Sequence, residues 1–127
     1  MARILSIGYL RDFLEQRAEL LHEAGHSVHN AATRDEAAAL LAIGNYDVCI
    51  FGHGVPENER NEMAAASRST SPNVALIFLY SGQIRRAELA DAVLNFHSSL
   101  PDLVQTVDYL VSKKQEARTI APRARTG

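Results

Sequence analysis

The 127-residue chain contains a single cysteine and no uninterrupted apolar run of the roughly 20 residues that span a membrane. One cysteine cannot close an intramolecular disulfide, so a disulfide-stapled secreted domain is excluded. Cys49 lies within an apolar stretch, where we expect a buried and unreactive thiol. The chain opens on a strand-like run and not on a signal sequence. We therefore expect a cytoplasmic protein without a membrane role.

Lysine is missing from residues 1–112, which carry a net charge of −6, whereas residues 113–127 carry +4. The basic segment is polar and cannot bury enough apolar surface to offset the entropy cost of ordering. Its five cations would contact nucleic acid only weakly and in a salt-dependent way, so we expect no nucleic-acid function. We divide the chain into one compact domain, residues 1–112, and a disordered basic tail, residues 113–127.

Strand-like apolar runs alternate with helical periodicity along this domain. Thr33 and Glu36 form a capping box at the start of one helix, and Gly25 and Gly44 supply helix stops. Five such βα units with short connections predict a parallel sheet with helices on both faces, in strand order 2-1-3-4-5. The expected strands cover residues 3–7, 26–30, 46–51, 73–79 and 94–97.

The helices are expected between and after these strands. The first has an apolar face at the spacing of one helical stripe, and the third follows Pro56. The fourth is expected over residues 84–93 and the fifth over residues 101–112, with Pro101 in its first turn. The apolar face of the first helix consists of Leu10, Phe13, Leu14, Ala18 and Leu21.

Six short motifs, in this order and spacing, resemble the receiver domain of bacterial two-component response regulators. The resemblance covers residues 3–112 and implies a flavodoxin-like (βα)5 doubly wound parallel sheet, the fold class that the alternation also predicts. The motifs are RIL, EAGHSV, TRDEAAALL, YDVCIFGHGVP, NVALIFLYSG and LPDLVQTVDYLV.

The residues that receivers use for phosphorylation are replaced in this chain. Gly8 and Tyr9 stand where the resemblance implies the Mg²⁺-binding carboxylates, and Gly52 stands where it implies the phosphoacceptor aspartate. Tyr80 stands in place of a serine or threonine, and residues 96–99 match the stretch with the family's lysine. Aspartyl phosphorylation needs a carboxylate nucleophile and a cation held by oxygen ligands. The sequence therefore predicts a pseudo-receiver that is not phosphorylated and is not an enzyme.

We expect such a pseudo-receiver to act in signal transduction through protein contacts, as a homodimer or with a histidine kinase or output regulator. The resemblance implies a partner face on the fourth helix, fifth strand and fifth helix, represented here by Arg85, Arg86 and Phe96. The alternative is a small-ligand or anion sensor that uses the degenerate pocket at the carboxyl ends of the strands. That pocket would be lined by Gly8, Tyr9, Gly52, His53 and Tyr80.

Other chemistry finds little support in the sequence. His53 could act as a general base or contact an anion, but no partner residue for catalysis can be named. His22, His26 and His29 are close in sequence, yet His26 and His29 point to opposite sides of an extended segment, so we expect no metal site. Neither a GxGxxG motif nor a Walker loop is present, and we expect no cofactor.

Overall fold

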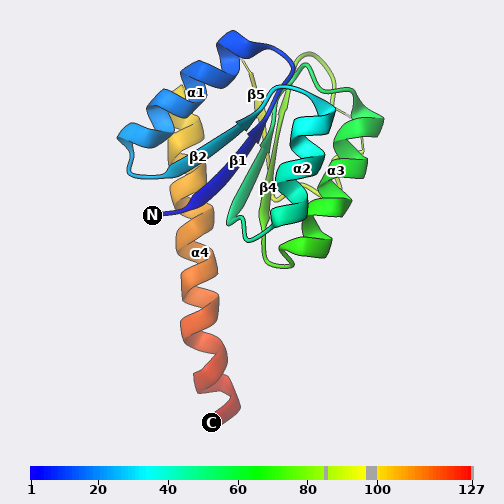
Figure 1. Ribbon diagram of the computed structural model, residues 1–127. Coiled ribbons are helices and arrows are strands. Elements are labelled where there is room, and N and C mark those ends of the chain that lie inside the picture. The colour runs from blue at the N-terminus through cyan, green and yellow to red at the C-terminus, as the bar shows by residue number, and fades with distance from the viewer. Residues whose placement is uncertain (85, 97–99, 127) are drawn as a thin grey trace.

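The computed structural model describes residues 1–84, 86–96 and 100–126, with the backbone alone for residue 100 and residues 115–126. Five parallel strands form one sheet in the order β2-β1-β3-β4-β5, as predicted (Figure 1). Every strand begins within two residues of its expected start. The strands are β1 Arg3–Ile7, β2 Ser27–Ala31, β3 Val48–Phe51, β4 Ala75–Tyr80 and β5 Ala92–Asn95.

Helices cover both faces of the sheet, so the predicted doubly wound α/β fold is confirmed. α1 and α4 lie on one face, and α2 and α3 lie on the other (Figure 1). The capping box predicted for α2 is present, because the Glu36 amide donates to Thr33 Oγ1 and the Glu36 carboxylate accepts from the Ala32 amide. The described helices are α1 Arg11–Glu23, α2 Arg34–Ile43, α3 Glu57–Thr70 and α4 Leu100–Thr126. None of them is both long and apolar enough to cross a membrane.

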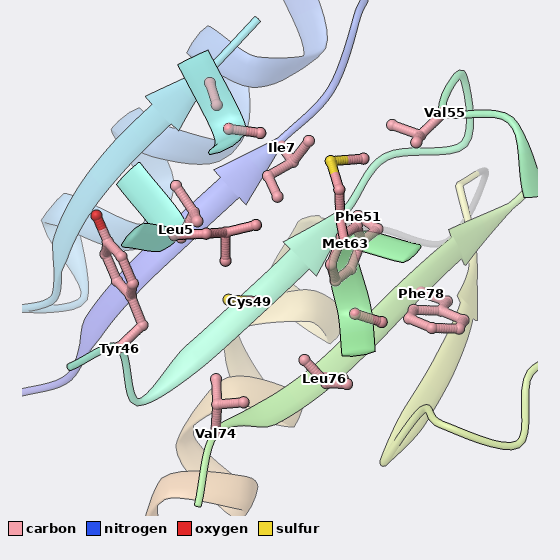
Figure 2. Close-up of a cluster of buried hydrophobic side chains, with 14 residues drawn as sticks. Leu5, Ile7, Tyr46, Cys49, Phe51, Val55, Met63, Val74, Leu76 and Phe78 are labelled. Carbon is pink, nitrogen blue, oxygen red and sulfur yellow. The ribbon is translucent and has the colours of Figure 1, made fainter. Parts of the chain in front are cut away.

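The core has two apolar clusters, one on each face of the sheet. On the α2–α3 face, Phe51 and Phe78 pack edge to face with their ring centroids 5.4 Å apart (Figure 2). Cys49 is fully buried in this cluster, and burial raises the pKa of its thiol to about 12. The expectation of a buried cysteine is confirmed, and its thiolate is inaccessible at neutral pH.

The helix expected over residues 84–93 does not form in the described part of that segment. Residues 81–84 and 86–91 make an irregular loop, and β5 begins at Ala92, inside the expected helix. Gly82 and Arg86 have positive φ angles of 74° and 51°, which an α-helix does not tolerate. The periodicity misled because apolar side chains of the loop pack on the core without a helix. These are Ile84, Ala87, Leu89 and Ala90.

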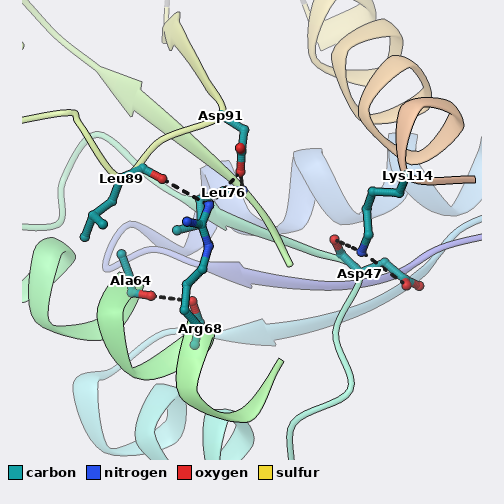
Figure 3. Close-up of polar contacts among 8 residues, drawn as sticks. Asp47, Ala64, Arg68, Leu76, Leu89, Asp91 and Lys114 are labelled. Atoms are coloured by element: carbon teal, nitrogen blue, oxygen red, sulfur yellow. Dashed lines mark hydrogen bonds and ion pairs between the residues drawn. The ribbon is translucent and has the colours of Figure 1, made fainter. Parts of the chain in front are cut away.

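Two polar side chains hold this loop in its non-helical path. The Leu76 amide donates to the Asp91 carboxylate over 2.7 Å, and the guanidinium of Arg68 contacts the same carboxylate at 3.0 Å (Figure 3). The same Arg68 Nη2 also donates to the Leu89 carbonyl. Asp91 thereby attaches the end of the loop to the backbone of β4.

The helix α4 continues to Thr126, past the end expected at residue 112. Lys114 accounts for part of this extension, because its Nζ donates to the Asp47 carbonyl at 3.1 Å and lies 3.7 Å from the Asp47 carboxylate (Figure 3). Beyond this contact α4 projects away from the sheet (Figure 1). An isolated helical segment of this length is marginal in water. The disorder expected for the basic tail therefore stays a prediction for residues 115–127.

The histidines near β2 have structural partners. His26 is buried; its Nδ1 accepts from the Ala2 amide at 3.0 Å and its Nε2 lies 2.8 Å from the Asp108 carboxylate on α4. His29 Nδ1 lies 3.0 Å from the Tyr46 hydroxyl. His26 therefore joins the amino-terminal end of the sheet to α4.

Candidate functional site

The carboxyl ends of β1 and β3 lie close together, so a side chain at Gly52 would be crowded. The Gly52 amide donates to the Ile7 carbonyl at 2.8 Å. A Cβ on Gly52 would lie 3.3 Å from that carbonyl oxygen and 3.4 Å from the Cα of Gly8. A side chain at position 52 would therefore be crowded, and its neighbours would have to move by a few tenths of an ångström.

Arg17, a residue of α1, fills the space beneath these two glycines. Its guanidinium Nη2 would lie 2.9 Å from a Cβ on Gly8 and 3.2 Å from a Cβ on Gly52. The side chain runs back along the helix toward its amino-terminal end, as long helical side chains do. A cation thus lies at the edge of the sheet where the resemblance implies an acidic cluster.

The guanidinium of Arg17 is nearly sequestered from solvent and poorly satisfied. The residue is 4% exposed, and its Nε is 3.4 Å from Ser6 Oγ. Its Nη2 is buried and has no hydrogen-bond partner among the described residues. Burial lowers the pKa of Arg17 to about 10, so the side chain is still charged at neutral pH.

Three aromatic rings cover the outer side of this space. His53 stacks on Phe96 with ring centroids 3.9 Å apart and an interplanar angle of 16°, and Phe13 packs edge-on to both rings. The rings come from α1, from the loop after β3 and from the end of β5. The space that they cover is too small for a water molecule. Its lining is Gly8, Tyr9, Leu10, Phe13, Arg17, Gly52, His53 and Gly54.

Tyr9 connects this region to α3. Its hydroxyl donates to Glu59 Oε1 at 2.8 Å, and burial together with this carboxylate raises the pKa of Tyr9 to about 12. The phenol therefore remains a neutral donor throughout the physiological range.

Tyr80 lies in a second, adjoining hollow of about 190 Å³. His53 borders both spaces, so it separates them. Four of the five pocket residues expected from the sequence, Gly8, Tyr9, Gly52 and His53, line the space beside Arg17, and Tyr80 lies beyond His53. The polar lining of the second hollow includes Glu57, Arg60, Ser81 and Gln83.

The expected partner face is placed differently by the structure. The helix that was to carry Arg86 is absent, and Arg86 lies exposed in the loop, with its carbonyl accepting from Arg60 Nη2. Phe96 follows β5 and stacks on His53 over the pocket. Arg85 lies outside the described residues.

Sequence reasoning missed Arg17 and the role of Phe13. The apolar face expected for α1 includes Leu10 and Phe13, yet these are 43% and 37% exposed, and the buried positions of α1 are Leu14, Arg17 and Leu21. The spacing i, i+3, i+7 places Arg17 between two buried leucines, which is the signal that could have revealed it.

Comparison with known proteins identifies the fold. No protein-family model matches the chain, and a search of curated proteins found no match. Among solved structures, a CheY-like receiver domain protein from Methanospirillum hungatei is 19% identical at a TM-score of 0.81, covering 91% of this chain and 98% of its own. Response regulator TrrA from Thermotoga maritima, in complex with Mg²⁺–BeF, is 25% identical at 0.74, covering 87% and 99%.

A further solved structure covers the carboxyl-terminal helix as well. Adenylate cyclase from Rhodopirellula baltica is 17% identical at a TM-score of 0.82, and the match covers 99% of this chain and 98% of that one. The chain therefore has the fold of response regulator receiver domains, CheY-like and flavodoxin-like, as the resemblance implies.

Proposed function

We propose that this chain is a pseudo-receiver, a signalling module that works through protein contacts and is not switched by aspartyl phosphorylation. The receiver fold supports a role in two-component signal transduction. The observation that carries the proposal is the guanidinium of Arg17 packed against Gly8 and Gly52. Those positions have no carboxylate to attack a phosphoryl group or to hold its metal ion.

Arg17 also opposes the metal ion directly. A divalent cation at the edge of β1 and β3 would face a buried like charge, and at an effective dielectric constant of about 20 this repulsion amounts to several kcal/mol within about 5 Å. Solvent does not relieve it, because Arg17 is buried. The nucleophile of aspartyl phosphorylation is therefore absent from this site, and the charge of the site is opposite to the one that a metal ion requires.

Incubation with acetyl phosphate and Mg²⁺ should leave the intact mass of the protein unchanged. A phosphorylatable receiver treated in parallel serves as the positive control, and it should gain one phosphoryl group. Addition of Mg²⁺ with beryllofluoride should likewise leave the melting temperature unchanged. Detection of an acid-stable, base-labile phosphoryl group within residues 1–112 would contradict the proposal.

For the contact surface, we propose the loop of residues 81–91 together with β5 and α4, with a second copy of the chain as the partner. Arg86 is exposed there, and among the described side chains of β5 and α4 the large apolar ones that are exposed are Val93 and Tyr109. The opposite charges of residues 1–112 and residues 113–127 favour association of two copies.

Light scattering after size exclusion should give twice the monomer mass, and Arg86→Glu should shift the protein toward the monomer because it reverses a charge on this surface. Arg34→Glu is the matched control, since Arg34 is exposed on α2, outside the proposed surface. A monomer at every concentration, or equal effects of both variants, would refute the dimer while leaving the phosphorylation result untouched.

A further inference from the structure

We infer that Arg17 anchors a binding site for a small oxyanion, a phosphate or carboxylate group, at the carboxyl ends of β1 and β3. The starting observation is Nη2 of Arg17, a buried donor without a partner among the described residues. Buried charges are normally paired, because desolvating an ion without compensation costs several kcal/mol. Among the described ion pairs, none includes Arg17.

Among the described residues, no carboxylate pairs with this guanidinium. Its Nη2 lies against Gly8 and Gly52, and its Nε reaches the hydroxyl of Ser6. An external anion would complement the charge. A guanidinium pairs with two oxygens of a phosphate or carboxylate at once, which gives such groups an advantage over halides.

The amino-terminal end of α1 adds a second, independent attraction for an anion. Its N-cap residue is Leu10, which has no side-chain oxygen, and the structure has no side-chain cap there. The first amides of the helix therefore lack an intrahelical partner and present the positive end of the helix dipole. Leu10 and Phe13 line the same space as Arg17. The one carboxylate in this turn, Asp12, is exposed.

Glycine at three positions lets an anion approach the backbone closely. Gly8, Gly52 and Gly54 all border the space, so these three positions contribute no side chain to it. The space has no room for a water molecule, and His53, which lines it, stacks on Phe96. Binding therefore requires the lining to open, and a movement of His53 away from Phe96 would connect the site to the end of β5.

Oxyanion binding at this site differs chemically from aspartyl phosphorylation, and experiments can distinguish the two. The oxyanion binds reversibly to a cation, whereas an acyl phosphate would change the intact mass. The proposal also does not depend on the dimer surface, because Arg86 takes no part in it. Phosphate binding without a mass change would support this inference and leave the proposed function intact.

Titration of the protein with inorganic phosphate, against sodium chloride of equal ionic strength, tests the site. We expect millimolar affinity, a melting temperature a few degrees higher near saturation, and shifts of the Gly8, Gly52 and Gly54 amide resonances in ¹⁵N-resolved spectra. Acetate in the place of phosphate tells whether a carboxylate is sufficient. Chloride should produce none of these changes.

Arg17→Met should abolish the phosphate response, whereas Lys113→Met, which removes an exposed charge from α4, should keep it. Each variant is first checked for native circular dichroism. Equal phosphate responses of wild type and Arg17→Met would overturn the proposal. Glycine amides that do not move in tens of millimolar phosphate would overturn it as well.

Discussion

Arg17→Met should raise the free energy of unfolding by about 1 to 3 kcal/mol, although it removes a buried residue of the native structure. The wild-type protein must desolvate the guanidinium without pairing its Nη2. Methionine keeps most of the apolar stem, which packs among the residues of α1 and the sheet, and it carries no charge. Among the described residues, the one hydrogen bond lost is the long contact of 3.4 Å to Ser6 Oγ. Urea denaturation followed by circular dichroism measures the difference.

The control for this prediction is Arg11→Met on the same helix. Arg11 is exposed, so its replacement should change stability by less than about 0.5 kcal/mol. A loss of stability in Arg17→Met would show that the guanidinium is compensated in the native state, for example by a water molecule. The combination of higher stability with a lost phosphate response would identify Arg17 as a residue retained for binding at a cost to folding.

Most of the fold follows from local patterns in the sequence. Apolar runs such as residues 73–79 form buried parallel strands because both faces of the sheet are covered, and Thr33 with Glu36 fixes a helix start by hydrogen bonds within a few residues. Such signals need no knowledge of distant contacts. The strand order follows from the short right-handed connections.

The segment between β4 and β5 could not be predicted in this way. Its apolar spacing fits a helix, but the path of the loop is set by Asp91 pairing with the Leu76 amide and with Arg68 of α3. These partners are 15 and 23 residues away along the chain. A tertiary contact therefore overrides the local propensity, and positive φ angles at Gly82 and Arg86 follow.

The candidate site was predicted in position but not in charge. Gly8 and Gly52 mark the carboxyl ends of their strands, where parallel sheets bind ligands. The charge at this edge depends on which side chain of α1 reaches it. The apolar positions of the helix did not reveal that Arg17 is the one that does. Arg17 places a positive charge where, by the resemblance, receivers have carboxylates.

Gly52→Ala should lower the free energy of unfolding by about 1 kcal/mol, because the added methyl group crowds the paired backbone of β1 in addition to the Arg17 guanidinium, which would lie 3.2 Å away. Its Cβ would lie 3.3 Å from the Ile7 carbonyl and 3.4 Å from the Gly8 Cα, both part of the paired β1 backbone. Gly54→Ala is the matched control. There the Cβ meets only side-chain atoms of Leu10, which is 43% exposed and free to rotate away.

A double-mutant cycle with Arg17→Met separates the two sources of crowding at this edge. The cost of Gly8→Ala should largely disappear in the Arg17→Met background, because the closest atom to its Cβ is the guanidinium Nη2 at 2.9 Å, and the next are side-chain atoms of Leu14 at ordinary contact distance. The cost of Gly52→Ala should persist, since its backbone neighbours remain. If Gly52→Ala were as mild as Gly54→Ala, β1 and β3 would not be closed against a side chain. An aspartate at position 52 begins with the same Cβ, so a persistent cost means that one substitution cannot restore a phosphoacceptor without moving the sheet edge.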